Sequence, residues 1–140
     1  MTGRDALRVG VAVQPAGASA NARAWTDGFN AALERFEADG AAVTHAPLDM
    51  LAADWAESAA RFDVVLWVPY WQGAASTSFM KERTQFLEEQ LGVVVVPNVA
   101  TTWHYESKVA QSDLLALAGV PTPRTVATFS ADDAEERLAG

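Results

Sequence analysis

Three short apolar runs, spaced along the chain, constrain its fold more than any other feature. Leu7–Val13 (LRVGVAV), Val64–Val68 (VVLWV) and Val93–Val96 (VVVV) each have the length of a strand and are rich in β-branched residues. A nearly continuous apolar run is typical of a strand that helices cover on both faces. We therefore expect these runs to be the central, buried strands of a largely parallel sheet.

The segments between these runs have helical character. From Asn21 to Asp39 apolar residues recur at steps of three and four, and Gly40 is placed to end the helix. A further short strand is expected within 41–48, and further helices over about 51–62, 78–90 and 102–118, the last of them ended by Gly119. Strands that alternate with helices predict an α/β fold with three layers, a Rossmann-like parallel sheet.

The C-terminal part contains the one candidate domain boundary. In Pro121-Thr122-Pro123 two prolines restrict the backbone and favour an extended connector. Residues 124–129 then alternate as a strand does, and Ser130-x-x-Asp133 resembles a capping box at the start of a last helix. We expect residues 1–123 to form one domain and residues 124–140 a trailing βα unit that begins another.

Composition excludes several classes of function. The net charge of −8, with only ten basic residues, argues against nucleic-acid binding, which needs clustered lysine and arginine. The chain has no cysteine, so it has no disulfide and no thiolate site, and His45 and His104 lack the spacing of a metal-binding pair. Neither a signal peptide nor an apolar run of about 20 residues is present. We expect a cytoplasmic protein without a membrane partner.

The loop after the strand at 64–68 is the most unusual in side chains. Ligands of open α/β sheets bind beyond the carboxyl ends of the strands. Tyr70, Trp71, Gln72 and Ser76 bring aromatic surface and hydrogen-bonding groups there, which suits a small polar substrate with a planar or apolar portion. Together with Asn98, in the loop after the next strand, they are the predicted substrate-binding residues. The structural alternative is that Trp71 merely packs over the end of the sheet.

Other polar groups have plainer interpretations. Gly17 and Ser19 precede a helix, whose free N–H groups can hold an anion, but the loop lacks a dinucleotide fingerprint and is best interpreted as an ordinary βα turn. His104 is interpreted as a surface or capping residue, and the acidic pairs at 88–89 and 132–136 as solvated helix faces. No catalytic residue is predicted in this chain.

The stretch from Val93 to Thr125 resembles a particular junction in ATP-grasp ligases. In that family a strand ends in a loop with asparagine, a helix carries a lysine in an Asp/Ser-Lys pair, and a Gly-Val/Ile-Pro-x-Pro-x-Thr segment follows. The matching residues here are Asn98, Ser107-Lys108 and Gly119-Val120-Pro121-Thr122-Pro123-Arg124-Thr125. Ser107 stands where the family usually has an acidic residue.

The resemblance implies a role for the whole segment. Residues 1–123 would be the N-terminal, substrate-side (pre-ATP-grasp) domain of an ATP-dependent carboxylate–amine or thiol ligase that acts through an acyl-phosphate. Lys108 would bind the phosphates of ATP, and the loop at 69–78 would line the cleft shared with the ATP-binding domain. Residues 124–140 would begin that domain, which would follow in the same polypeptide and supply the ligands of Mg²⁺. The 140 residues alone would then be inactive.

Alternatives remain open on the sequence. Lys108 could be a solvated helix lysine that pairs with Glu106 or Asp113. The chain could also be a stand-alone flavodoxin- or receiver-like domain that binds a small molecule. It could equally be a fragment of a sugar-nucleotide transferase, because such enzymes also begin with Rossmann-like units. A receiver is disfavoured, because Gln14-Pro15 and Pro69-Tyr70 stand where it carries acidic residues. The oligomeric state is open, with a homodimer among the possibilities.

Overall fold

The fold is seen in a computed structural model that describes residues 6–68, 74–104 and 107–139. The chain forms two compact units, Met1–Thr102 and Trp103–Gly140. The first unit contains the sheet and the helices that cover it. The second contains two helices joined by an extended segment.

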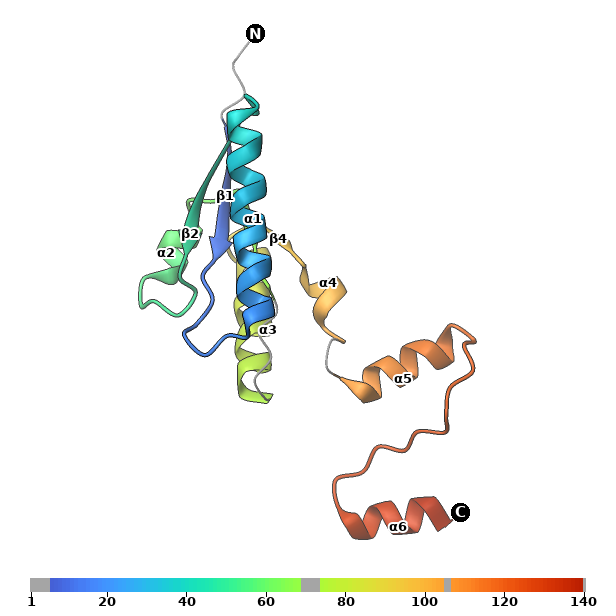
Figure 1. The fold of residues 1–140 in the computed structure, drawn as a ribbon. Helices are drawn as coiled ribbons and strands as arrows, with labels where there is room; N and C mark the ends of the chain where they lie inside the picture. Colours follow the sequence, from blue (N-terminus) through green and yellow to red (C-terminus); the bar gives the residue numbers. More distant parts are fainter. Residues whose placement is uncertain (1–5, 69–73, 105–106, 140) are drawn as a thin grey trace. The chain divides into compact units, whose positions relative to one another are not determined.

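The sheet of the first unit has four parallel strands in the order β2-β1-β3-β4 (Figure 1). These strands are β1 (Leu7–Ala12), β2 (Val43–Leu48), β3 (Val64–Leu66) and β4 (Val94–Val96). In the register, Val9 is opposite His45 on one side and Val64 on the other, and Val64 is in turn opposite Val94. The predicted parallel α/β architecture is confirmed.

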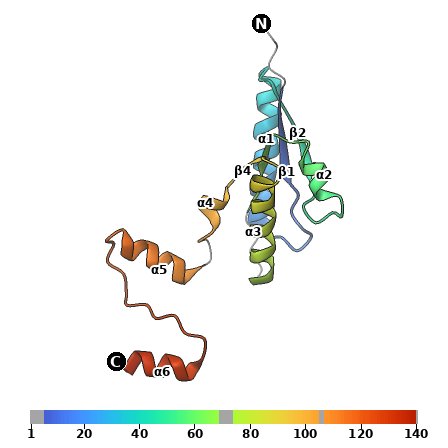
Figure 2. The ribbon, with the colours of Figure 1, turned by 180° about the vertical axis from the view of Figure 1, so that it is seen from behind.

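Helices cover the two faces of the sheet and make three layers. On one face α1 (Ala20–Ala38) buries Leu33 against Val9 and Val11 of β1. The other face is covered by α2 (Trp55–Ala59) and α3 (Ala74–Glu89), which Figures 1 and 2 show on the side of the sheet away from α1. Successive strand residues point to opposite faces, so each central strand contributes to both clusters.

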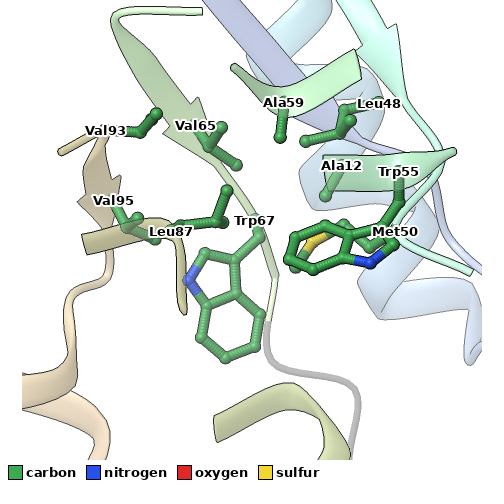
Figure 3. Packing of buried hydrophobic residues seen from close by; sticks show 10 residues of the cluster. All are labelled: Ala12, Leu48, Met50, Trp55, Ala59, Val65, Trp67, Leu87, Val93 and Val95. Atoms are coloured by element: carbon green, nitrogen blue, oxygen red, sulfur yellow. The ribbon is translucent and has the colours of Figure 1, made fainter. Parts of the chain in front are cut away.

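The larger cluster lies between the sheet and the helices α2 and α3. Trp67 is 1% exposed and fills its middle, where its indole Nε1–H donates a hydrogen bond of 2.7 Å to the carbonyl oxygen of Pro97 (Figure 3). Burying an indole without a partner for its N–H is costly, so this bond allows the Trp67 indole to be buried almost completely. The other buried members are Ala12, Leu48, Met50, Trp55, Ala59, Val65, Leu87, Val93 and Val95.

Local signals set the ends of α1. The Ser19 hydroxyl caps the helix by accepting the Ala22 N–H at 3.1 Å. Gly40 follows the helix with φ of 84°, a conformation that side chains with a Cβ rarely adopt, and so lets the chain turn back toward β2. The helix predicted over 21–39 and its glycine stop are confirmed.

The prediction that Val93–Val96 is a central strand covered on both faces is wrong. β4 pairs only with β3 and forms an edge of the described sheet. Val93 and Val95 are buried, whereas Val94 and Val96 are 58% and 47% exposed. Val94 and Val96 lie on the same face of the sheet as Val64 and Leu66. The cluster under α1 includes Val64 and Leu66 but neither of these β4 valines. An unbroken apolar run therefore belongs here to a strand with one buried face.

The single helix predicted over 102–118 is also wrong. The first unit ends with a separate short helix, α4 (Val99–Thr102), and α5 (Lys108–Leu117) begins only at Lys108. The Ser107 hydroxyl caps α5 by accepting the Ala110 N–H at 3.3 Å. Gly119, with φ of 69°, follows α5 as the sequence indicates.

The trailing βα unit is half confirmed. Residues 124–128 form no strand, although their side chains alternate. A strand needs a neighbour for its backbone hydrogen bonds, and alternation alone does not supply one. The last helix, α6 (Ala131–Ala139), does form, and the Ser130 hydroxyl accepts the Asp133 N–H at 3.1 Å as predicted for its cap. The domain boundary at Pro123 stays a prediction.

Candidate functional site

A cavity of about 270 Å³ lies in the first unit at the carboxyl end of the sheet. Its described wall comes from four segments: residues 12–15 at the end of β1 and directly after it, Met50 and Leu51 after β2, Val68 after β3, and Ser76, Phe79 and Met80 on the first turns of α3. The carboxyl ends of parallel strands meet at one edge of a sheet, which is where ligands of open α/β folds bind. This cavity is therefore the candidate binding site.

Backbone contacts bring the first two segments together. The pairing of β1 with β2 continues beyond β1, because the Val13 N–H donates to the Leu48 carbonyl oxygen at 2.9 Å. After β2, the Asp49 carboxylate accepts the Leu51 N–H at 2.9 Å and turns the chain so that Met50 and Leu51 follow the strand end closely. Hydrogen bonds from the Val13 and Leu51 backbone N–H groups thus hold both segments.

Among the described residues, the cavity wall is mostly apolar, with Gln14 and Ser76 as its polar members. The side-chain oxygen of Gln14 is buried and has no hydrogen-bond partner in the part of the chain that the structure describes. Buried polar atoms nearly always have a partner. Gln14 is therefore the polar group of the wall that most needs a donor.

An arginine lies beside the cavity and was missed by sequence reasoning. The Arg83 guanidinium carbon is 3.9 Å from the Trp55 ring centroid and 4.7 Å from that of Phe79. Phe79 itself lines the cavity. Arg83 follows Phe79 by one helical turn, but nothing in the sequence indicates that Trp55, from α2, approaches the same guanidinium.

The predicted substrate-binding residues have different outcomes. Ser76 lines the cavity. Tyr70, Trp71 and Gln72 lie outside the described residues, so their predicted role stays a prediction. Asn98 does not line the cavity. Its side-chain oxygen accepts the Thr101 N–H at 2.9 Å and the Thr101 hydroxyl at 2.9 Å, and so caps α4. For this oxygen the structure shows a local capping role.

Lys108 belongs to the second unit, where it is the first residue of α5 and is exposed. Its Nζ is 3.4 Å from the Gln111 side-chain oxygen, one turn along the same helix. Within the described residues it forms no ion pair with Asp113, and Glu106 lies outside them. Among the described residues, the ammonium has one hydrogen-bond contact, a weak one to a neutral amide.

The strongest electrostatic effect lies at the opposite end of the sheet. The Asp63 carboxylate, just before β3, accepts hydrogen bonds from the Arg8 backbone N–H at 2.8 Å and from the Arg8 guanidinium at 2.7 and 3.1 Å. These bonds lower the pKa of Asp63 from 3.8 to about 2. The hydrogen bonds of Asp63 therefore join the amino ends of β1 and β3, at the end of the sheet remote from the cavity.

No group of three or more histidine, cysteine, aspartate or glutamate side chains able to hold a metal ion occurs among the described residues. Nor does any helix in residues 6–68, 74–104 and 107–139 combine the length and apolar composition needed to cross a membrane. Comparison with protein families, curated proteins and solved structures finds no match.

Proposed function

We propose that these residues form the N-terminal, substrate-side domain of an ATP-dependent ligase of the ATP-grasp type. The ligase would join a carboxylate to an amine or a thiol through an acyl-phosphate. In this role the domain binds a substrate, and a following ATP-grasp domain in the same polypeptide supplies most of the ATP site and the ligands of Mg²⁺. The protein would act in the cytoplasm.

The observation that carries this proposal is the setting of Lys108. It is exposed in the first turn of α5, directly after the Ser107 cap, and no carboxylate among the described residues neutralises it. After Gly119 the chain continues without regular structure through Pro121 and Pro123. A lysine ammonium is a mobile point charge suited to a polyphosphate. This setting supports the role that the resemblance to the ATP-grasp junction implies.

The cavity supports the substrate half of the proposal. It lies at the carboxyl end of a parallel sheet, as substrate sites of open α/β folds do, and Ser76 forms part of its wall. Tyr70, Trp71 and Gln72, which precede α3 in the sequence, would complete the substrate contacts. Catalysis in such a ligase would depend on substrate positioning and on charge neutralisation. This domain would contribute the positioning.

The test is ATP binding by the longer protein in which an ATP-grasp domain follows this chain. Lys108→Met removes the charge and keeps much of the apolar stem, so stability should change by no more than about 0.5 kcal/mol. Loss of a charge-assisted bond to phosphate, worth about 1.5–3 kcal/mol, should weaken ATP binding roughly 10- to 150-fold. Calorimetric titration of ATP into both proteins measures the ratio.

Lys81→Met is the matched control, because Lys81 is the only other lysine of the chain and belongs to α3. It should leave ATP binding unchanged. Equal affinities of wild type and Lys108→Met would make Lys108 an ordinary solvated lysine and would remove the main support for a ligase.

One observation favours a second candidate, a stand-alone α/β domain that binds a small molecule. The wall residues of the cavity all come from the first unit, so binding there requires no further domain. This candidate predicts ligand binding by the 140-residue chain and no effect of Lys108→Met on it. A reading frame that continues past Gly140 into a glycine-rich hairpin and a lysine-bearing strand would favour the ligase instead.

A further inference from the structure

We propose that the cavity binds the apolar body of a small carboxylic acid and that Arg83 binds its carboxylate. The ligand class is a short aryl- or branched alkyl carboxylate. Its identity as a ligase substrate rests on the proposed function, whereas its binding to this domain does not. The inference assigns a binding residue that no sequence motif indicates.

The size and wall of the cavity indicate the apolar half of this ligand. About 270 Å³ is near the lower end of the range of small-molecule sites, which suits a compact body such as a phenyl ring rather than a nucleotide. Met50, Phe79 and Met80 form much of the wall, and methionine adapts its shape to apolar guests. No residue of the described wall is charged.

The setting of Arg83 indicates the anionic half. Its guanidinium lies over the rings of Trp55 and Phe79, at 3.9 and 4.7 Å from their centroids. Stacking on aromatic faces holds the guanidinium plane while leaving the N–H groups on its edge available to an acceptor. A planar fork fixed in this way favours bidentate binding of a carboxylate, since little side-chain entropy remains to be lost.

The guanidinium is also free of competing anions. Within the described residues Arg83 forms no ion pair and no hydrogen bond, although the chain carries a net charge of −8. Arg8, Arg35 and Arg137, by contrast, each pair with an aspartate. Arg83 is thus a cation that stacks on aromatic rings and whose N–H donors no described residue occupies.

Phe79 connects the two halves. Its ring lines the cavity and its centroid is 4.7 Å from the guanidinium carbon, so a ligand whose apolar body lies against this ring has to cover about that distance to place its carboxylate on Arg83, which is not itself a wall residue. A linker of one or two methylene groups spans such a separation. The probe that follows from this geometry is 3-phenylpropanoate, and its uncharged control is 3-phenylpropanamide.

The methionines of the chain provide the readout. Met50 and Met80 both line the cavity, so methyl-labelled methionine places two reporters in its wall. We expect 3-phenylpropanoate to shift the Met50 and Met80 methyl signals saturably in the 140-residue chain. A Kd in the millimolar range is typical of a ligand of this size.

Two comparisons test the role of Arg83. The amide should bind the wild-type chain about 10- to 150-fold more weakly than the acid, as expected for loss of a charge-assisted hydrogen bond. Arg83→Gln should weaken binding of the acid by a similar factor and leave the affinity for the amide unchanged. Leu51→Trp, at an exposed wall position, should fill the cavity and weaken the binding of both the acid and the amide.

Equal binding of acid and amide by the wild-type chain would overturn the proposal without any substitution. So would the absence of saturable shifts at Met50 and Met80, or an unchanged affinity of Arg83→Gln for the acid. These measurements contain no nucleotide and no second domain, whereas the test of Lys108 measures ATP binding. Carboxylate binding by Arg83 can therefore be refuted while the ligase proposal holds, and the reverse is equally true.

Discussion

Arg8 and Asp63 form an ion pair that joins two strands of the sheet. Their bonds join the amino ends of β1 and β3, which are neighbours in the sheet but 55 positions apart in the sequence. The carboxylate is thereby favoured over the protonated acid, and the pKa of Asp63 falls to about 2. A group whose pKa is lowered by folding stabilises the folded state above its unfolded pKa, and that stabilisation is lost as the pH falls through the folded pKa.

The contribution of Asp63 should therefore be complete above about pH 4 and should disappear toward pH 2. Titrated by carboxyl-carbon NMR, Asp63 should have its midpoint near 2, and Arg8→Gln should return the midpoint toward 3.8. Arg35→Gln, which removes a partner of Asp39 instead, is the control and should leave the Asp63 midpoint in place. A normal Asp63 midpoint in the wild-type chain would mean that the Arg8 bonds do not persist in solution.

Among the elements, α1 depends most clearly on its ends. It is the described helix that packs against Val9 and Val11, yet its exposed residues include Trp25 and Phe36, so its packing is confined to a narrow stripe. The first turn contains no acidic residue, which leaves the Ser19 hydroxyl as the group that satisfies a free N–H there. Capping should accordingly matter more to α1 than to a helix buried on a wide face.

Ser19→Ala should lower the free energy of unfolding by about 0.5–2 kcal/mol, because the Ala22 N–H loses its acceptor. Ser19→Asp restores an acceptor and adds a negative charge at the positive end of the helix, so it should leave stability unchanged or slightly raised. Urea unfolding followed by circular dichroism measures both. Equal midpoints for the alanine and aspartate variants would contradict a capping role.

In the molecule as a whole, burial is distributed unevenly. The buried core belongs to the first unit, where residues of β1 and β3 contribute to both apolar clusters. In the second unit α5 has no buried residue, and Leu117 is 87% exposed. Local opening costs less free energy where few apolar contacts hold an element.

Hydrogen exchange should reveal this difference. Amides of β1 and β3 should exchange slowest, and those of α5 and α6 should exchange faster by orders of magnitude because their helices open without disturbing the core. Mass spectrometry of peptic peptides from the intact chain gives the comparison in one experiment. Protection of α5 equal to that of β1 would show that its apolar side chains are covered in solution.

The sequence also predicted part of the candidate site. The rule that ligands bind beyond the carboxyl ends of parallel strands indicated the segment after β3, and Val68 and Ser76 of that segment line the cavity, together with residues after β1 and β2 that were not predicted. Ser76 was predicted from its loop. Arg83 was not, because its environment depends on Trp55 and Phe79, which different helices bring together.

By itself, the sequence determined the elements whose causes are local. Runs of β-branched residues make β1 and β3, the three- and four-residue spacing makes α1, and Ser19, Gly40 and Ser130 mark helix ends through their own backbone preferences. Only the tertiary structure decided that β4 is an edge with one buried face, that residues 124–128 remain unpaired, and that Arg83 lies between two rings. Each of these depends on which neighbour lies alongside, and neighbours distant in sequence leave no trace in a local pattern.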